Sequence, residues 1–177
     1  MIGHHFVLQD LIEKHDWSYG AEIGVKFGKT FTYLLDSCPK LVLLGIDIWI
    51  SRPERDAFRA EGGRGYQNLD MPGIEKDLRA LVAEQYPTRG WLINAFSVDA
   101  AKDIADASLD FVFIDAGHLK DDVITDINAW KPKIKHGGML LGHDYSLPGV
   151  RYAVDALCPG YMTLPHDVWA LDIRNQS

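Results

Sequence analysis

Apolar residues occur along this chain in two alternating patterns, short continuous runs and runs at helical spacing. Residues 41–48 and 109–114 are nearly continuous apolar segments, as expected of parallel strands that are covered on both faces. Further predicted strands are residues 18–25, 91–96 and 139–141. The helical spacings predict an N-terminal helix within 1–17 and further helices at 29–36, 74–85, 100–107, 119–130 and 150–157.

The end of the chain is predicted to form an antiparallel pair of strands. Segments 161–164 and 168–173 are rich in apolar residues and are separated by Pro165, His166 and Asp167. Strands that alternate with helices are typical of domains with a parallel sheet. The fold class is therefore predicted to be α/β, with successive α/β units and a closing hairpin.

Residues 51–73 interrupt this alternation. The segment is rich in glycine, proline and charged residues, which predicts an irregular insertion near the substrate rather than part of the core. Arg52, Arg55 and Arg64 could hold an acidic substrate there, although solvated loop charge is the favoured interpretation. A chain of 177 residues is most simply one domain, 1–177.

Composition and charge argue against several classes of protein. The net charge is −7 with no block of like charges, which disfavours a nucleic-acid partner because phosphate contacts need clustered Lys and Arg. Cys38 and Cys158 are far apart and lack metal-binding spacing, which favours a reducing compartment. Residues 1–20 are too polar for a signal peptide, and no segment approaches the roughly 20 apolar residues that span a bilayer. We therefore expect a cytoplasmic protein with no membrane partner.

Three predicted strands reach a carboxylate at or near their ends. Glu22, Asp47 and Asp115 each lie at the end of an apolar run and precede a turn. In an open parallel sheet, the carboxyl ends of the strands line the ligand crevice. A row of carboxylates there suits a nucleoside with free hydroxyls and an amino-acid tail, so we expect a cofactor of that kind.

Gly24 and Gly28 lie between the first predicted strand and the following helix. Glycines at such a turn let the backbone approach a ligand closely, and the helix N-terminus favours a carboxylate or phosphate. An ordinary strand-to-helix turn is the alternative. The dinucleotide fingerprint G-x-G-x-x-G is absent from this position.

Asp47 ends the second predicted strand, where a carboxylate can accept both hydrogen bonds of a ribose diol. A helix cap or a solvated turn is the alternative for this residue. Trp49 and Ile50 could flank an adenine, or Trp49 could instead be an exposed loop residue that anchors the insertion. His4 and His5 are expected at an exposed helix start, with cover of the pocket as the alternative.

Four motifs, in order, resemble those of class I S-adenosylmethionine-dependent methyltransferases. They are Glu22-Ile23-Gly24 with Gly28, Asp47, Phe113-Ile114-Asp115 with His118, and Gly137-Gly138 with His143-Asp144-Tyr145. Within that class they are most similar to the small, metal-assisted O-methyltransferases of natural-product sugars and phenols. The resemblance covers about residues 18–173. It implies a Rossmann-like three-layer α/β/α sandwich with a seven-stranded, mostly parallel sheet in the order 3-2-1-4-5-7-6.

The resemblance also implies where the cofactor would be held. Gly24 would lie under the methionine portion of S-adenosylmethionine with Glu22 beside it, and Asp47 would hold the ribose. Ser97 falls where family members contact adenine, with Val98 beside it. The full predicted cofactor site is Glu22, Gly24, Gly28, Asp47, Trp49, Ser97, Val98 and Asp115.

A metal site and a catalytic pair are implied in the same way. Asp115 and Asp144 fall at positions that bind a divalent metal in metal-dependent relatives, and His118 matches a histidine proposed as catalytic base. Relatives carry two adjacent acids after the fifth strand, and His143 replaces the first of them here. Oxygen ligands suit Mg²⁺ or Mn²⁺, whereas an imidazole suits Mn²⁺, Fe²⁺ or Zn²⁺ better. The predicted catalytic residues are His118 and Asp115, and the predicted metal ligands are Asp115, His143 and Asp144. Two alternatives are a two-histidine, two-carboxylate site that also includes His118, and two loop histidines that are bonded to backbone.

The resemblance implies a methyltransferase that acts on a hydroxyl of a small molecule. A metal ion would lower the pKa of that hydroxyl, and a histidine would take its proton. Two alternatives stay open: a protein that binds S-adenosylmethionine without catalysis and, less favoured, an NAD-dependent oxidoreductase. The methyl acceptor cannot be read from the sequence, and a homo-oligomer that completes its pocket from a second subunit is left open.

Overall fold

The structure, a computed structural model, describes residues 3–50 and 69–175. Its helices are α1 (His4–His15), α2 (Lys29–Ser37), α4 (Met71–Gln85), α5 (Ser97–Lys102), α6 (Lys120–Trp130), α7 (Pro148–Leu157) and the short 3₁₀ turns η1 (Lys131–Lys133) and η2 (Ile173–Asn175). Its strands are β1 (Tyr19–Ile23), β2 (Val42–Asp47), β3 (Gly90–Asn94), β4 (Leu109–Ile114), β5 (Ile134–Gly142), β6 (Met162–Leu164) and β7 (Val168–Asp172). Most of the predicted insertion, residues 51–68, lies outside the described residues. None of the helices in the described part of the chain is long and apolar enough to cross a membrane.

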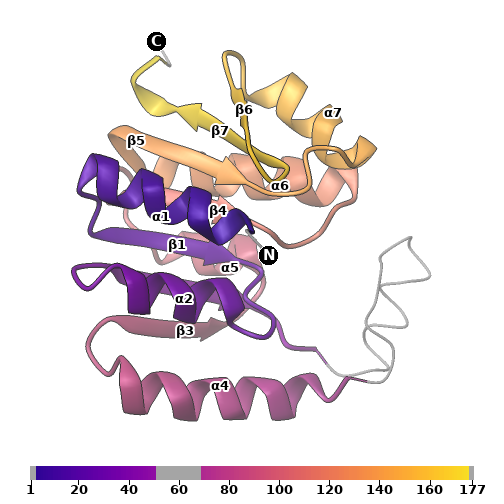
Figure 1. Cartoon of the computed structure of the whole chain (residues 1–177). Coiled ribbons are helices and arrows are strands. Elements are labelled where there is room, and N and C mark those ends of the chain that lie inside the picture. Colours follow the sequence, from indigo (N-terminus) through magenta and orange to yellow (C-terminus); the bar gives the residue numbers. More distant parts are fainter. Residues whose placement is uncertain (1–2, 51–68, 176–177) are drawn as a thin grey trace.

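One seven-stranded sheet forms the centre of the molecule, in the order β3-β2-β1-β4-β5-β7-β6 (Figure 1). Neighbouring strands from β3 to β5 are parallel, and β7 is antiparallel to both β5 and β6. The predicted α/β class, strand order and closing hairpin are confirmed.

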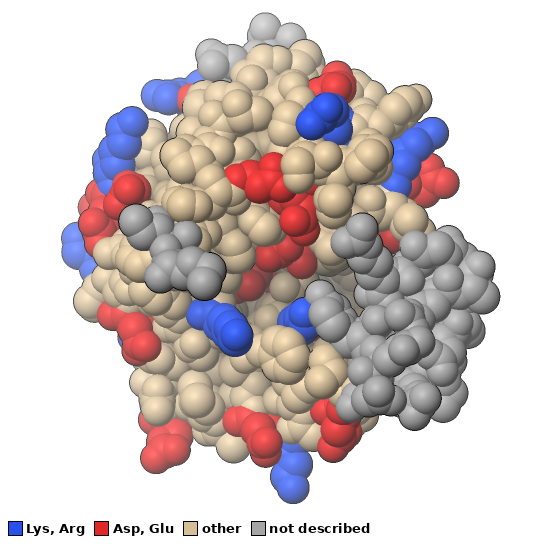
Figure 2. Space-filling model, turned by 45° about the vertical axis from the view of Figure 1, so that its right-hand side comes forward, with Lys and Arg blue, Asp and Glu red and all other residues tan. Residues whose placement is uncertain are grey.

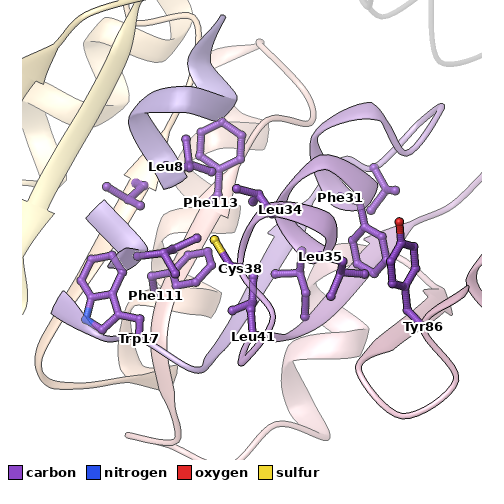
Figure 3. Close-up of a cluster of buried hydrophobic side chains, with 14 of the residues drawn as sticks. Leu8, Trp17, Phe31, Leu34, Leu35, Cys38, Leu41, Tyr86, Phe111 and Phe113 are labelled. Atoms are coloured by element: carbon purple, nitrogen blue, oxygen red, sulfur yellow. The ribbon is translucent and has the colours of Figure 1, made fainter. Parts of the chain in front are cut away.

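Helices cover both faces of the sheet, which makes the fold a three-layer sandwich (Figure 1). On one face, Leu8 of α1 and Leu34 of α2 pack in one buried cluster with Phe113 of β4 (Figure 3). On the other face, α5, α6 and α7 cover a second cluster, which contains Val112 of β4 and Trp130 of α6. Adjacent residues of β4 thus enter opposite clusters, as the pleat of a strand requires. Burial on both faces explains why this strand is apolar throughout.

The position of α1 follows from the short turn that joins it to β1. Asp16 adopts a left-handed conformation (φ 50°) as the C-cap of α1, and the chain reverses there before β1 begins at Tyr19. α1 therefore runs back along the sheet, and its first residue, His4, lies at the edge where the parallel strands end (Figure 1).

The boundaries of β5, α4 and α5 differ from the prediction. β5 is longer than residues 139–141, because Gly137 and Gly138 continue the strand through an irregularity instead of ending it. A Cβ on Gly138 would lie 2.3 Å from the carbonyl oxygen of Asp110 on β4, so only glycine allows this approach. The glycine pair therefore marks a close contact between strands as well as a turn.

The start of α4 was also placed too late by the sequence pattern. Asp70 caps this helix by accepting a hydrogen bond from the Gly73 N–H (3.0 Å), and Met71 is already helical. Residues 70–73 are thus the cap and first turn of a helix rather than the end of an irregular insertion. α5 covers Ser97–Lys102 instead of the predicted 100–107, since the left-handed Ala107 (φ 52°) lies in the turn before β4.

Candidate functional site

The carboxyl ends of the parallel strands stop at one level of the sheet. The register pairs Ile93 of β3 with Ile46 of β2, Ile46 with Ile23 of β1, and Ile23 with Ile114 of β4. Ile114 is paired in turn with Gly142 of β5. The residues that come next form a row along this edge: Asn94, Asp47, Gly24, Asp115 and His143. The structure thus brings together strand ends that are far apart in the sequence.

A cavity of about 850 Å³ opens at this edge. This volume lies in the range of roughly 300–1,000 Å³ that is typical of pockets for small molecules. Acidic side chains gather in the hollow at the centre of the face shown in Figure 2. The predicted site residues that line the cavity are Glu22, Gly24, Asp47, Ser97, Val98, Asp115, His118, His143 and Asp144. Gly28 and Trp49 are not among its described lining residues.

The turn after β1 is built on two glycines with positive φ. Gly24 has a φ of 94°, and a Cβ on it would lie 2.2 Å from the carbonyl oxygen of Asp115. Gly28 has a φ of 74° as the N-cap of α2, and a Cβ there would meet Leu78 of α4 at 2.4 Å. Gly24 therefore lets the turns after β1 and β4 lie against each other under the cavity, whereas Gly28 allows α4 to pack against α2.

Asp47 joins the loops that follow β1 and β2. Its Oδ2 accepts a hydrogen bond from the Lys26 N–H (2.8 Å), and its Oδ1 accepts one from the Trp49 N–H (3.0 Å). Trp49 is only 2% exposed, and its indole N–H donates to the Lys26 carbonyl at 2.9 Å. The structure therefore buries Trp49 beneath the loop, so it is neither beside an adenine in the cavity nor the exposed loop tryptophan of the alternative. The Asp47 carboxylate lines the cavity and retains lone pairs for further hydrogen bonds.

Glu22 is a buried carboxyl group that faces the cavity from β1. Its side chain is 2% exposed, and its Oε2 has no hydrogen-bond partner among the described residues. Burial, together with the negative charges of Asp115 and Asp47, raises the pKa of Glu22 well above its ordinary value. A cationic ligand group placed against Oε2 would give this oxygen a hydrogen-bond partner and would offset its buried negative charge. This position therefore suits the ammonium of an amino-acid tail.

The far end of the cavity carries a polar group that the sequence analysis did not identify. Asp126 of α6 is 6% exposed and lines the cavity, and Ser97 lies beside it with its hydroxyl accepting from the Trp130 indole N–H (2.7 Å). Burial raises the pKa of Asp126 to about 6, although a hydrogen bond with Ser97 acts in the opposite direction. The signal was present in the sequence, because Asp126 lies three residues after Val123 and four before Trp130, on the apolar side of the helix.

Replacing Asp126 with Asn should remove a pH-dependent loss of stability. The folded protein keeps this proton to a higher pH than the unfolded chain, so the free energy of unfolding falls as pH rises from about 4 to 6. Above that window we expect the Asp126→Asn protein to be more stable than the parent by about 2 kcal/mol. Urea denaturation of the cofactor-free proteins at pH 5 and pH 8 measures this. Asp121→Asn, on the exposed side of the same helix, should show no such gain.

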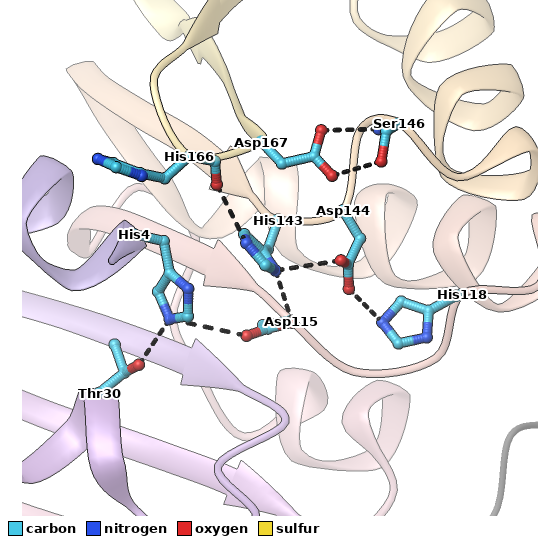
Figure 4. A network of polar contacts seen from close by, with 9 residues as sticks. All are labelled: His4, Thr30, Asp115, His118, His143, Asp144, Ser146, His166 and Asp167. Carbon is cyan, nitrogen blue, oxygen red and sulfur yellow. Dashed lines mark hydrogen bonds and ion pairs between the residues drawn. The ribbon is translucent and has the colours of Figure 1, made fainter. Parts of the chain in front are cut away.

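Carboxylates and imidazoles gather where β4 and β5 end (Figure 4). His118 Nε2 lies 2.6 Å from Asp144 Oδ2, and His143 Nδ1 lies 3.3 Å from Asp144 Oδ1. The same His143 nitrogen lies 3.6 Å from Asp115 Oδ1, while its Nε2 contacts the His166 carbonyl oxygen at 3.1 Å. The predicted catalytic and metal residues therefore form one connected network, and His143 is bonded to side chains as well as to loop backbone.

Proton equilibria in this network follow from its geometry. Burial by itself lowers the pKa of His143, but hydrogen bonds and charge from Asp115 and Asp144 raise it to about 10. The hydrogen bond with Asp144 also raises the pKa of His118, against the effect of burial. The two histidines in turn lower the pKa of Asp144. Asp144 is therefore a carboxylate at neutral pH and holds both imidazoles in place.

His4 is a further member of the site, contrary to the expectation of an exposed helix start. Its side chain is 22% exposed and lines the cavity, with Nε2 2.7 Å from Thr30 Oγ1 and 4.0 Å from Asp115 Oδ2. Burial lowers the pKa of His4, although the charge of Asp115 opposes this. A helix that enters β1 through a tight turn must begin at the carboxyl edge of the sheet, and that sequence feature could have placed His4 here.

Comparisons with solved structures find the same fold in proteins of low sequence identity. A putative caffeoyl-CoA O-methyltransferase from Staphylococcus aureus matches with a TM-score of 0.66 and 16% identity, over 94% of this chain and 80% of that chain. The O-methyltransferase NovP matches with a TM-score of 0.68 and 12% identity, over 96% and 77% of the two chains. CalS11, a TDP-rhamnose 3′-O-methyltransferase of calicheamicin biosynthesis, matches with a TM-score of 0.61 and 16% identity, over 94% and 77%. At such identities the likeness shows the fold alone.

A family model connects the fold to an activity. No curated protein matches the sequence. The model of a methyltransferase domain, however, matches residues 21–145, which is more than half of the chain. That span runs from β1 to the turn after β5 and so includes the row of strand ends and most of the cavity. This chain therefore belongs to the class I S-adenosylmethionine-dependent methyltransferases.

Proposed function

We propose that the protein transfers a methyl group from S-adenosylmethionine to a hydroxyl group of a small molecule, with a divalent metal ion at the acceptor side. One observation carries this proposal: two chemically different groups of residues line the same cavity. Glu22 and Asp47 lie where β1 and β2 end, and Asp115, His143 and Asp144 lie where β4 and β5 end. A cofactor and a chelated acceptor would then be neighbours, as a direct transfer between them requires.

The first group fits S-adenosylmethionine. Glu22 Oε2 lacks a partner among the described residues and would pair with the ammonium of the methionine tail. The Asp47 carboxylate, which lines the cavity, would accept the ribose hydroxyls, and Ser97 with Val98 would border the adenine. When bound, S-adenosylmethionine supplies a methyl group already activated by its sulfonium. The task of these residues is to hold that methyl group toward the second half of the cavity.

The second group fits a divalent metal and an acceptor hydroxyl. We propose Asp115, His143 and Asp144 as ligands, since they offer carboxylate oxygens and an imidazole nitrogen on one side of the cavity. A metal held there would lower the pKa of a coordinated hydroxyl. We propose His118 as the base: its Nε2 pairs with Asp144 Oδ2 at 2.6 Å, which leaves Nδ1 as the proton acceptor. Structural neighbours named as O-methyltransferases support a hydroxyl acceptor.

Replacing His118 with Gln should separate catalysis from cofactor binding. We expect turnover to fall by about 100-fold or more, as for loss of a general base, while the affinity for S-adenosylmethionine changes less than about twofold. S-adenosylhomocysteine release is measured against a panel of hydroxylated sugars and phenols with Mg²⁺, Mn²⁺ or Zn²⁺, and affinity is measured by calorimetry. His136→Gln, exposed on β5 outside the cavity lining, is the control.

Two outcomes would contradict the proposal. Tight binding of S-adenosylmethionine with no S-adenosylhomocysteine release from any acceptor would indicate a non-catalytic binding protein. Stabilisation by NAD alone in a thermal melt would indicate an oxidoreductase, because only a ligand of the folded state raises the apparent stability.

A further inference from the structure

We propose that His4, from α1, is a metal ligand together with Asp115 and His143, and that the site therefore takes an imidazole-binding transition-metal ion such as Zn²⁺ in preference to Mg²⁺. This deepens the proposed function, since it concerns the metal half of the same cavity, but metal binding is measurable without any methyl transfer. The two histidines and the carboxylate come from three separate elements: the start of α1 and the ends of β4 and β5.

The donor atoms of these three side chains already face one another. His4 Nε2 lies 4.0 Å from Asp115 Oδ2, and His143 Nδ1 lies 3.6 Å from Asp115 Oδ1. One ligand atom from each residue can be chosen so that all three lie within 4.8 Å of one another. Donors that share a tetrahedral Zn²⁺ at about 2.1 Å lie about 3.4 Å apart, so small rotations of the side chains would bring them to bonding positions.

The orientation of His143 supports a role as ligand. Its Nε2 contacts the His166 carbonyl oxygen at 3.1 Å, so Nε2 carries a proton that it donates, and Nδ1 is directed to the carboxylates (Figure 4). Metal-binding histidines usually donate their second nitrogen to a carbonyl or carboxylate in this way, which fixes the ring and the tautomer. The turn that provides the carbonyl is itself braced, because Asp167 accepts hydrogen bonds from the Ser146 N–H (2.8 Å) and hydroxyl (2.6 Å).

His4 is held beside this group rather than in solvent. Its ring lies beside the His143 ring (Figure 4), at 4.4 Å between centroids. The ring of Phe113 lies 5.5 Å away, centroid to centroid. Thr30 Oγ1, at 2.7 Å from Nε2, holds the ring at the mouth of the site, and a metal ion bound to Nε2 would replace this hydrogen bond. The side chains of His4, Asp115 and His143 are each 22% exposed, which leaves them reachable from the cavity but shielded from bulk water.

The donor set determines which ion is favoured. Mg²⁺ prefers oxygen ligands and is bound weakly by imidazole, whereas two imidazoles and a carboxylate suit Zn²⁺, Fe²⁺ or Co²⁺. The substitution of an acid by His143 and the addition of His4 both change the site in this direction. His4 also links α1 to the strand ends, so metal binding would fix the wall of the cavity that α1 forms.

The test is metal binding by the tag-free, cofactor-free protein. Calorimetry with Zn²⁺ and absorption spectra with Co²⁺ should show one site in the parent, with Mg²⁺ bound more weakly. In His4→Gln we expect Zn²⁺ affinity to fall at least tenfold and the visible Co²⁺ absorption to weaken, with Mg²⁺ affinity unchanged. The matched control is His136→Gln, because His136 is exposed on β5 and is not among the residues that line the cavity.

Equal Zn²⁺ affinity in the parent and in His4→Gln would overturn the proposal, and so would a parent that binds no Zn²⁺ or prefers Mg²⁺. A His4→Gln protein that melts at the parent temperature and keeps its affinity for S-adenosylmethionine excludes a loss of fold as the cause. Failure of S-adenosylmethionine to bind the parent would instead count against the proposed function, so the two failures are distinguishable.

Discussion

Replacing Gly24 with Ala should lower the free energy of unfolding by about 3 kcal/mol or more and abolish binding of S-adenosylmethionine. Two effects add at this position. The positive φ of 94° costs an alanine about 1–2 kcal/mol. Its Cβ would also lie 2.2 Å from the Asp115 carbonyl oxygen and 2.7 Å from Ala116 Cα, which are backbone atoms that cannot rotate away. The turns after β1 and β4 would have to separate, and the row of site residues with them.

Gly160 offers a matched control for the strain. It also has a positive φ, 82°, but nothing lies within 4 Å of a Cβ placed there. Gly160→Ala should therefore cost only about 1 kcal/mol and leave cofactor affinity unchanged. Urea denaturation and calorimetry measure both quantities. Equal costs at the two glycines would mean that the approach of Gly24 to the Asp115 backbone has no energetic importance.

Replacing Glu22 with Gln should change stability and affinity in opposite directions. Because the pKa of Glu22 is raised in the folded protein, the free energy of unfolding falls as pH rises above its ordinary value of 4.5. Glutamine is neutral and avoids this loss, so the cofactor-free variant should be more stable than the parent at pH 8, and the difference should shrink toward pH 5. The affinity for S-adenosylmethionine should fall about 10- to 100-fold, as expected for loss of a charged hydrogen bond.

A gain in stability together with a loss of affinity distinguishes a ligand-binding role of Glu22 from a structural one. Denaturation at pH 5 and pH 8 gives the stability, and calorimetry gives the affinity. Glu84→Gln, at an exposed position of α4, should change neither quantity. If Glu22→Gln were more stable but bound S-adenosylmethionine as tightly as the parent, Glu22 would not be part of the cofactor site.

The strand pattern made the sheet predictable, because buried parallel strands are nearly continuous apolar runs. β4, residues Leu109–Ile114, has the predicted boundaries for this reason. Gly138 is different: glycine favours turns, yet here it lies within β5 and permits the close approach of β5 to β4. The contact that requires glycine is made with a residue distant in sequence, so local pattern alone could not identify it.

Part of the site could likewise be predicted from the sequence, and part could not. The carboxyl ends of parallel strands meet at one edge of the sheet, so the sequence alone predicts that Glu22, Asp47 and Asp115 lie together. The direction of a loop side chain could not be predicted in this way. Trp49 enters the core because its φ is 34° and its indole N–H donates to the Lys26 carbonyl. His4 depends on how α1 packs, which the helical spacing of its apolar residues does not specify.

The Asp47 carboxylate accepts two backbone hydrogen bonds and also lines the cavity, which affects the energetics of cofactor binding. By bonding the amides of Lys26 and Trp49, it fixes two loops to each other through contacts within the chain itself. The conformational entropy of ordering these loops is thus lost during folding and not on association. Preorganisation of this kind leaves more of the interaction energy for affinity, since an incoming nucleoside does not have to assemble its own receptor.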